Sequence, residues 1–104
     1  QLLGVDNICL LEDVSVGALL HTVRVRFRRS EVYTRVSRIL IAVNPFKMLP
    51  IYSAQTLQDY VKAADSMDLP PHIYGIGLDA INGLRKGKAR SQAVLISGES
   101  GAGK

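Results

Sequence analysis

Hydrophobic residues in the first third of the chain recur at the spacing of a helix. The pattern predicts a helix that ends at about Arg28 and starts at a polar capping residue, either Asp13 or Ser15. Because residues three and four apart lie on the same side of a helix, its apolar positions are expected to form one face. Those positions are Leu19, Leu20, Val23 and Phe27.

Two strands are expected after this helix. Residues 32–36 alternate between apolar and polar or small side chains, which is typical of a half-buried strand. Residues 39–43 are continuously apolar, which predicts a strand buried on both faces. Only Ser37 and Arg38 separate the two runs, so we expect a tight antiparallel hairpin even though its turn has no glycine.

The second half of the chain predicts two further helices. Ser53 can cap a helix over residues 54–64, and the polar stretch 65–68 breaks it. The proline pair at 70–71 opens another helical stretch that reaches about Leu84.

Two glycines, Gly75 and Gly77, lie inside this last helical stretch. A glycine in a helix interior costs roughly 1 kcal/mol relative to alanine. The helix is therefore expected either to be weak or to pack closely against something at these positions.

A last strand is predicted over Ala93–Ile96. This run is short, continuously apolar and rich in β-branched residues, like a strand that is covered on both faces. The order of helices and strands is mixed and shows no internal repeat. We therefore predict an α/β fold in which helices flank a mixed sheet.

Composition fits one intracellular domain. The chain has 104 residues, of which 47% are hydrophobic, enough to fill a core. Its apolar runs are far shorter than the roughly 18 residues of a membrane span, and its start does not resemble a secretory signal. The single cysteine, Cys9, forms no internal disulfide, suits a reducing compartment and is expected to be a buried small hydrophobe.

The net charge of +4 is concentrated in two clusters, within residues 24–29 and within residues 85–90. Such clusters can bind nucleic acid or an anionic surface. However, they lack the interleaved aromatic residues of a single-strand binding surface. Solvated helix ends and loops are the interpretation that we favour.

The chain ends in a pattern typical of a phosphate-binding loop. Residues Gly98–Lys104 match all but the last position of G-x-x-x-x-G-K-[ST], whose glycines let backbone N–H groups point at a polyphosphate. The lysine brings a cation to the β and γ oxygens, and the Ser or Thr that holds Mg²⁺ would follow Lys104. The strand predicted just before the loop supports this interpretation, and an ordinary surface loop is the alternative.

A second candidate segment runs from Asn44 to Tyr52. Its two prolines stiffen the backbone, and the Asn44 amide can both donate and accept hydrogen bonds, as is needed to read a purine edge. Tyr52 offers an aromatic body and Pro45 an apolar surface for a planar base. The alternative is a rigid turn with a capping asparagine and a packed tyrosine.

Four motifs, in order along the chain, resemble the motor head of the myosins. Residues 98–104, Gly-Glu-Ser-Gly-Ala-Gly-Lys, are similar to its phosphate loop GESGAGKT. Residues 43–52 resemble its purine-binding loop, residues 71–74 its PHIF/PHIY motif, and residues 19–21 with 32–34 its LLHNL…IYT segment. The resemblance covers nearly the whole chain.

The resemblance implies an ATP-driven actin motor. Residues 1–104 would be an N-terminal fragment of its motor domain, and so a partial domain of the P-loop NTPase type. ATP and Mg²⁺ would be the cofactors, with the metal ligand beyond Lys104 and none within the chain. The parent would bind actin filaments, with light chains or calmodulin as further partners, and would be cytoplasmic and cytoskeleton-associated, with no nucleic acid and no membrane at this segment.

The resemblance also implies roles for individual residues. Ser100 would lie near the γ-phosphate and the attacking water and would, with Lys104, take part in catalysis, while Glu99 is expected to point away from the phosphates. The adenine would lie among Asn44, Pro45, Lys47 and Tyr52, and the phosphates among Gly98, Glu99, Ser100, Gly101, Ala102, Gly103 and Lys104.

The chain also departs from the family pattern. After Tyr74 the family usually continues with an alanine-rich helix that bears an aromatic residue, whereas here Gly75-Ile76-Gly77 follows. Residues 85–90 are also more basic than usual, which indicates a divergent member whose class stays open. The switch segments that complete the family's catalytic site are absent from these residues, so we expect the chain by itself to hydrolyse no ATP usefully.

Two other functions remain as alternatives. One is a P-loop enzyme of another class, such as a small-molecule kinase or a GTPase, but those enzymes carry the phosphate loop near the chain start and here it begins at Gly98. The other is a non-catalytic basic module that binds nucleic acid or acidic lipid. Salt-dependent affinity for such ligands without nucleotide binding would favour it.

Overall fold

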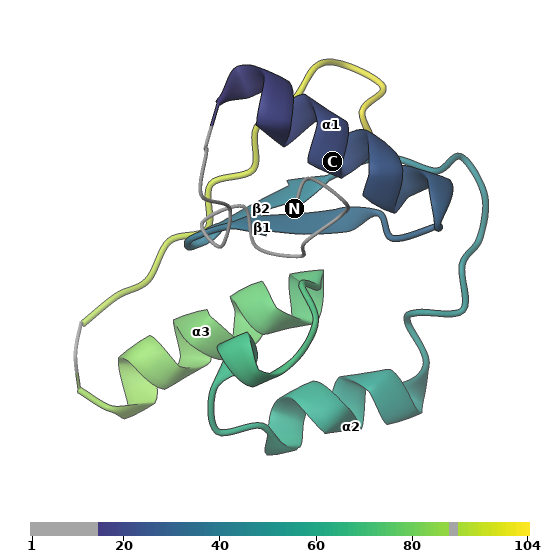
Figure 1. The fold of residues 1–104 in the computed structure, drawn as a ribbon. Coiled ribbons are helices and arrows are strands. Elements are labelled where there is room, and N and C mark those ends of the chain that lie inside the picture. The colour runs from purple at the N-terminus through teal and green to yellow at the C-terminus, as the bar shows by residue number, and fades with distance from the viewer. Residues whose placement is uncertain (1–14, 88–89) are drawn as a thin grey trace. The chain divides into compact units, whose positions relative to one another are not determined.

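A computed structural model describes residues 15–87 and 90–104 of the chain (Figure 1). It divides into two compact units, residues 1–49 and residues 50–104, and each is described by itself. Cys9, Asp13 and, within the second basic cluster, Lys88 lie outside the described residues.

The elements of the described residues are mixed α/β, as the sequence predicts. In chain order they are the helix α1 (Val16–Arg28), the strands β1 (Tyr33–Val36) and β2 (Ile39–Ala42), the helix α2 (Ala54–Lys62), the short 3₁₀-helix η2 (Ser66–Asp68) and the helix α3 (Ile73–Arg85).

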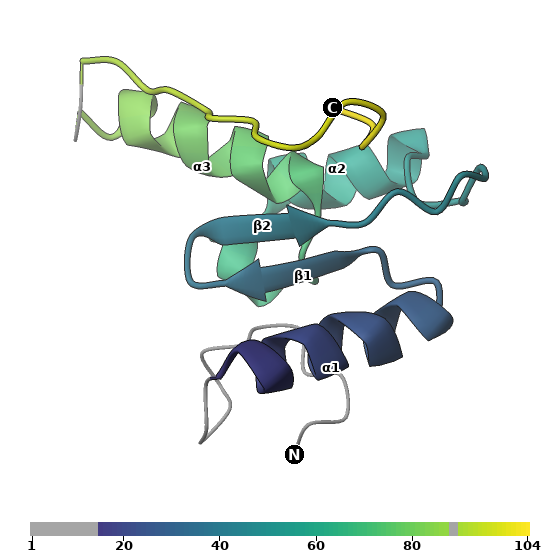
Figure 2. The same ribbon diagram turned by 90° about the horizontal axis from the view of Figure 1, so that it is seen from above.

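The first unit packs α1 along a two-stranded hairpin (Figures 1 and 2). The helix begins where predicted, because the Ser15 hydroxyl accepts the Ala18 N–H at 3.1 Å and so satisfies one unpaired donor of the first turn. Its buried residues are Ala18, Thr22 and Arg26, which are spaced four apart. These residues form the helix face that packs in this unit.

The predicted apolar face of α1 is only partly correct. Leu19 packs against the core residue Ala18, but Leu20 is 64% exposed and Phe27 is 39% exposed. The apolar residues span a wider arc of the helix than two strands can cover. The buried face of the helix therefore consists of two small side chains, Ala18 and Thr22, which let the hairpin approach closely, and of Arg26, which donates hydrogen bonds to the Tyr33 carbonyl.

The hairpin is confirmed with the predicted two-residue connection. β1 and β2 pair antiparallel in a register that places Tyr33 opposite Ala42 and Val36 opposite Ile39. Ser37 takes the turn position that usually needs glycine, with a φ of 55°. The expectation that the second strand is buried on both faces was wrong, because Ile39 is 66% exposed in a sheet of two strands.

Arg26 joins the helix and the hairpin of this unit through a contact that we call the Arg26 clamp. Its Nε and Nη2 atoms donate to the Tyr33 carbonyl at 3.3 and 2.9 Å, and its Nη1 lies 2.8 Å from the Glu31 carboxylate. The side chain is buried, and its charge is compensated by these acceptors. One residue therefore fixes α1, the following loop and the start of β1.

The second unit is built from helices with side-chain caps. Ser53 caps α2 by accepting the Thr56 N–H at 3.1 Å, as predicted. α3 begins after the predicted proline pair, with His72 as its capping residue. Gly75 is packed closely, since a Cβ placed there would lie 3.4 Å from the Ser66 Cβ, whereas a Cβ at Gly77 would meet nothing within 4 Å.

The predicted strand over residues 93–96 was wrong. In the described residues of the second unit no strand is present with which it could pair, and a strand needs a hydrogen-bonded neighbour. The segment is extended and exposed, with Leu95 at 94% and Ile96 at 65% exposure. The sheet of the described chain is thus the two-stranded hairpin alone, and the mixed sheet of a P-loop fold is not formed by these residues.

Within the described ranges, every helix is too short or too polar to cross a membrane.

Candidate functional site

The loop Gly98–Lys104 closes on itself. The Ala102 N–H donates to the Glu99 carbonyl at 3.1 Å and forms a turn at the tip. A Cβ placed on Gly98 would lie 3.3 Å from the Ala102 Cβ and 3.7 Å from the Lys104 Cγ, so the two ends of the loop are in contact. The seven residues form a ring of backbone with the lysine folded over its start.

Glycine is required at three positions of this loop. At Gly98 a side chain would crowd Ala102, while Gly101 and Gly103 have φ values of 85° and 94°, which other residues rarely adopt. The lack of a Cβ at these positions also lets a ligand approach the backbone closely. This spacing of glycines is therefore dictated by the shape of the loop.

The charged and polar groups of the loop are all exposed. Glu99, Ser100 and Lys104 offer one carboxylate, one hydroxyl and one ammonium group to solvent. In this conformation the Ala102 N–H is directed at the Glu99 carbonyl, so the row of inward-pointing N–H groups expected from the sequence is incomplete. Binding of a polyphosphate through that row requires the turn at the tip to open.

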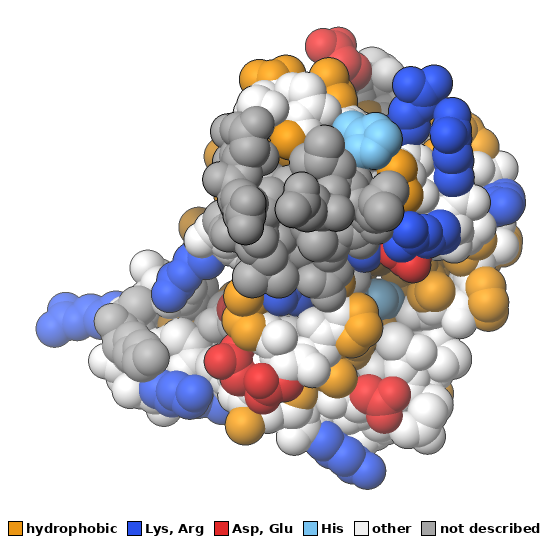
Figure 3. All heavy atoms as spheres, in the orientation of Figure 1, with side chains coloured by type: hydrophobic (Ala, Val, Ile, Leu, Met, Phe, Trp, Pro, Cys, Tyr) orange, Lys and Arg blue, Asp and Glu red, His pale blue; other side chains and the backbone are white. Residues whose placement is uncertain are grey.

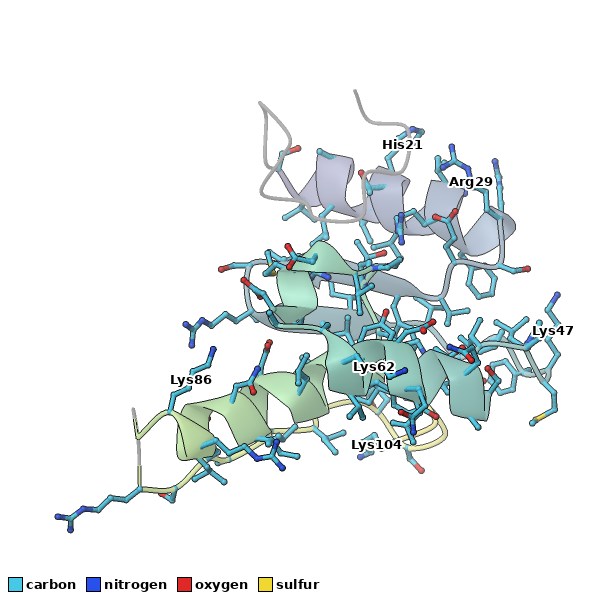
Figure 4. The ribbon with its side chains drawn as sticks, turned by 90° about the horizontal axis from the view of Figure 1, so that it is seen from below. His21, Arg29, Lys47, Lys62, Lys86 and Lys104 are labelled. Atoms are coloured by element: carbon cyan, nitrogen blue, oxygen red, sulfur yellow. The ribbon has the colours of Figure 1, made fainter. Side chains whose placement is uncertain are left out.

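The segment at Asn44 is a rigid turn in the first unit. The Asn44 Oδ1 accepts the Phe46 N–H at 2.8 Å, and Phe46 has a φ of 53°, the left-handed conformation that such a turn stabilises. Pro45 is half-buried, and Lys47 is exposed and points away from the hairpin (Figure 4). Because the side-chain oxygen of Asn44, Oδ1, accepts the hydrogen bond that holds the turn, the side-chain NH₂ group is the part suited to contact a ligand.

Tyr52 belongs to the second unit and lies in a cluster of aromatic rings. Its ring meets His72 edge-on at a centroid distance of 5.3 Å and Tyr74 at 6.2 Å. Tyr60 of α2 completes the cluster, 5.2 Å from His72. Tyr52 remains 47% exposed, whereas Tyr60 and His72 are buried. The cluster therefore covers one part of the Tyr52 ring and leaves another part accessible to solvent.

His72 was missed as an individual residue by the sequence reasoning, which noted it only as part of a motif. Its Nδ1 accepts the Tyr74 N–H at 3.0 Å, which places the proton of the neutral ring on Nε2, and Nε2 donates to the Ile51 carbonyl at 2.8 Å. Burial lowers the pKa of His72 below its ordinary value, and the hydrogen bond to Ile51 acts in the opposite direction. The signal in the sequence was a polar, cap-forming side chain between a proline pair and an apolar helix.

The predicted site residues are thus distributed over both units. The loop Gly98–Lys104 and Tyr52 belong to the second unit, whereas Asn44, Pro45 and Lys47 belong to the first. The predicted base-binding segment therefore crosses the boundary between the units. Among the described residues, no group of three or more His, Cys, Asp or Glu side chains is arranged to hold a metal ion.

The basic residues of the first cluster lie in the second half of α1 and just after it. Lys and Arg side chains gather around the C-terminal end of α1 on the face shown in Figure 3, where positive charge is favourable for the helix dipole. Arg26, however, is buried in its clamp. Charge here stabilises a helix end, as the favoured interpretation of the sequence held. His21, on the same helix, is exposed and turned away from the hairpin (Figure 4).

Comparison with known proteins finds one family and many relatives. The profile of the family described as Myosin head (motor domain) matches residues 5–104. The chain is 39% identical to the high molecular weight form of myosin-1 of Acanthamoeba castellanii, 41% to unconventional myosin-VIIb of Mus musculus and 42% to unconventional myosin-Ia of Gallus gallus, in each case over 97% of this chain. The chain spans 6%, 5% and 10% of the length of these three relatives.

Proposed function

Because the chain belongs to the myosin motor-domain family, we propose that it forms the ATP-binding portion of an actin-based motor. The family match covers both candidate segments in one chain. In this proposal residues 44–52 receive the adenine and residues 98–104 receive the phosphates. The proposal gives a use to the glycine loop, while the turn at Asn44 agrees both with the proposal and with the alternative of a rigid turn with a capping asparagine.

The glycine pattern of the loop Gly98–Lys104 is the observation that carries the proposal, since Gly101 and Gly103 have φ values of 85° and 94° and let a ligand approach the backbone closely. Gly98 lies against Ala102 and the Lys104 side chain, in a space that a Cβ would fill. Once the turn at its tip opens, a glycine-rich loop of backbone N–H groups with a cation at its edge is suited to a compact polyanion and offers little to an apolar or cationic ligand. Lys104 would neutralise charge on the β and γ oxygens, and Ser100 would offer a hydroxyl beside the γ-phosphate.

The adenine end relies on residues that are already oriented. The turn at Asn44 fixes the amide, so its NH₂ group would donate to a nitrogen acceptor on the purine edge. In the second unit, the exposed part of the Tyr52 ring would lie against the base, and in the first unit Pro45 offers an apolar surface and Lys47 a cation. Preorganised groups of this kind reduce the ordering cost of binding.

Mg²⁺ enters this proposal with the nucleotide. When bound, it would supply positive charge that offsets the charge of the phosphates. The side-chain oxygens that the described loop offers are the Ser100 hydroxyl and the Glu99 carboxylate, and no catalytic step is assigned to these residues through the metal. Glu99 is placed beside phosphates that would repel it, and we assign it a position pointing away from them.

The partners follow from the family. We propose that the protein that carries this chain binds actin filaments and acts in the cytoplasm on the cytoskeleton, with light chains or calmodulin as further partners of that protein. The residues of this chain would contribute nucleotide binding to that activity.

Photoaffinity labelling tests the proposal directly. An azido-adenine derivative of ATP should label the chain within residues 44–52, and unlabelled ATP should suppress the label. Lys104→Ala should weaken ATP binding about tenfold or more, because it removes a charge-assisted contact worth roughly 1.5–3 kcal/mol. Lys62→Ala is the matched control, since Lys62 is an exposed lysine of the same unit at the end of α2 (Figure 4).

The outcomes separate the candidate functions. Labelling of residues 44–52 that Lys104→Ala abolishes and Lys62→Ala leaves intact supports the proposal. Equal labelling by guanine and adenine nucleotides, with no label at 44–52, would favour a P-loop enzyme of another class. Binding to nucleic acid or acidic vesicles that falls steeply with salt, without nucleotide labelling, would favour the basic module.

A further inference from the structure

His72 lies between the candidate adenine segment and a helix terminus, and both of its ring nitrogens are used. Nε2 donates to the carbonyl of Ile51, 21 residues earlier in the chain, at 2.8 Å, while Nδ1 caps α3 by accepting the Tyr74 N–H at 3.0 Å. A histidine can make this pair of contacts only when it is neutral and protonated on Nε2. We call the Nε2 contact the His72 tie.

A second contact reinforces this tie two residues further on. The Tyr74 hydroxyl lies 3.5 Å from the Tyr52 carbonyl, at the outer limit of a hydrogen bond. Directly after Tyr52, Ser53 caps α2. The backbone of residues 51–53 is therefore held from both sides, by the first turn of α3 and by the first turn of α2.

The aromatic cluster sets the direction of the Tyr52 ring. His72 and Tyr74 both meet this ring edge-on, at interplanar angles of 69° and 74°, which is a favourable arrangement of aromatic pairs. Tyr52 is 47% exposed and His72 is 6% exposed. A ligand can therefore reach the Tyr52 ring, whereas His72 is buried and contacts only the protein side of this ring.

From this geometry we propose that His72 is a positioning residue for nucleotide binding, which holds the Ile51 carbonyl and the Tyr52 ring in the orientation that receives the base. The inference rests on the proposed function, because it concerns the adenine end of the same site. His72 itself does not touch the nucleotide. Its action is to prevent residues 51 and 52 from adopting other conformations, so that the ring is in place before the ligand arrives.

The size of the effect follows from the ordering that the tie provides in advance. If the tie is lost, binding must order about one additional residue and one aromatic side chain, which corresponds to about a tenfold loss of affinity for an adenine nucleotide. Affinity for inorganic tripolyphosphate should stay the same, since it depends on the loop at residues 98–104. The distinguishing prediction is therefore a loss confined to ligands that carry the base.

His72→Asn separates the tie from the helix cap. An asparagine is among the best capping residues, so its side chain can still accept the Tyr74 N–H, but it is too short to reach the Ile51 carbonyl. Asp65→Ala is the control for a lost cap in the same unit, because the Asp65 carboxylate caps η2 by accepting the Met67 N–H at 3.0 Å and takes no part in the tie. Affinities for a fluorescent ATP derivative and for tripolyphosphate are measured on all three chains.

The expected result is about a tenfold weaker binding of the ATP derivative by His72→Asn, with tripolyphosphate binding unchanged and with both ligands unaffected in Asp65→Ala. The inference is overturned if His72→Asn binds the ATP derivative as tightly as the unaltered chain, or if it loses affinity for both ligands equally. Failure of the unaltered chain to bind either ligand would instead refute the proposed function.

The unaltered chain provides a second measurement that requires no variant. Imidazole ¹⁵N chemical shifts should identify His72 as protonated on Nε2, and addition of ATP should shift these resonances while tripolyphosphate leaves them in place. A ring protonated on Nδ1, or resonances that do not respond to saturating ATP, would contradict the inference even if His72→Asn failed to fold.

Discussion

Each of the two units contains a buried polar side chain that links a helix to a carbonyl outside that helix, but the chemistry of these two links differs. In the first unit Arg26 donates twice to the Tyr33 carbonyl and pairs with Glu31. In the second unit His72 donates once to the Ile51 carbonyl and accepts the Tyr74 N–H. The first link depends on a charge and the second on its absence.

This difference indicates separate tasks. A guanidinium keeps its charge over the whole physiological range, so the Arg26 clamp responds little to conditions and suits a permanent scaffold. An imidazole changes its state near neutrality, and protonation would turn the Nδ1 of His72 from an acceptor into a donor facing the Tyr74 N–H. The unit that carries the loop Gly98–Lys104 is thus the one whose link can be released.

The largest expected effect comes from removing the clamp. Arg26→Ala deletes two hydrogen bonds from a buried charged donor to the Tyr33 carbonyl and the ion pair with Glu31, so we expect the first unit to lose about 3 kcal/mol of unfolding free energy. Urea unfolding followed by NMR measures this, with the Ile41 amide of β2 reporting on the first unit and the Leu78 amide of α3 on the second.

Arg28→Ala is the matched control for this prediction. Arg28 is an exposed arginine in the same last turn of α1, and removing it should cost only a few tenths of a kcal/mol through the helix dipole. Equal losses in the two variants would show that general charge, rather than the clamp, holds the unit. A loss at Leu78 as large as that at Ile41 would show that the units do not unfold separately.

Mild acid should lower the unfolding free energy of the second unit but not that of the first, and this effect is smaller than the loss expected from Arg26→Ala. Burial lowers the pKa of His72 from its ordinary value of 6.5, so the unfolded chain takes up the proton more readily than the folded one. The contribution of His72 to stability is therefore complete above about pH 6.5 and falls as the pH drops toward the lowered folded pKa. Unfolding free energies at Leu78 should fall over this window.

The same titration has an internal reference and a variant control. The reference is Ile41, in the unit without the tie, whose unfolding should not follow the titration of His72. In His72→Asn the acid-dependent step at Leu78 should disappear. A step of the same size in this variant would assign the acid sensitivity to another group.

Local patterns in the sequence predicted the local structure well. The caps at Ser15 and Ser53 and the hairpin across Ser37 and Arg38 were confirmed, because each depends on residues that are neighbours in the chain. Of the two expectations for the glycines in the last helix, weakness or close packing, the structure shows close packing at Gly75 and open space at Gly77. Short-range hydrogen bonds and turn geometry suffice for such predictions.

Features that depend on distant partners were predicted less well. An apolar run such as residues 93–96 becomes a strand only beside another strand, and none is available in the described part of the second unit. The burial of Arg26 and the tie at His72 arise from carbonyls 7 and 21 residues away. For the candidate site, the sequence supplied the residues that we propose to meet a ligand, but not the buried His72 that we propose to position one of them.

Helix propensity offers a stabilising change in the second unit. Gly77 lies inside α3, and a Cβ placed there would meet nothing within 4 Å, so Gly77→Ala should raise the unfolding free energy at Leu78 by about 1 kcal/mol. Gly75→Ala should gain less, because its Cβ would contact Ser66 and Tyr60. Equal gains from both substitutions would mean that the close approach at Gly75 imposes no constraint.

The smallest predicted effect concerns the turn of the first unit, where the opposite substitution is favourable. Ser37 has a φ of 55°, and the left-handed conformation costs a non-glycine residue about 1–2 kcal/mol, while the extra freedom of glycine in the unfolded chain costs about 0.5–1 kcal/mol. Ser37→Gly should therefore raise the unfolding free energy at Ile41 by about 0.5 kcal/mol. Arg38 in the same turn does not have a positive φ, so a glycine there relieves no backbone strain. Arg38→Gly only increases the conformational freedom of the unfolded chain and should therefore destabilise the hairpin. A gain from Arg38→Gly would show that the turn, unlike the clamp at the other end of β1, has no fixed conformation.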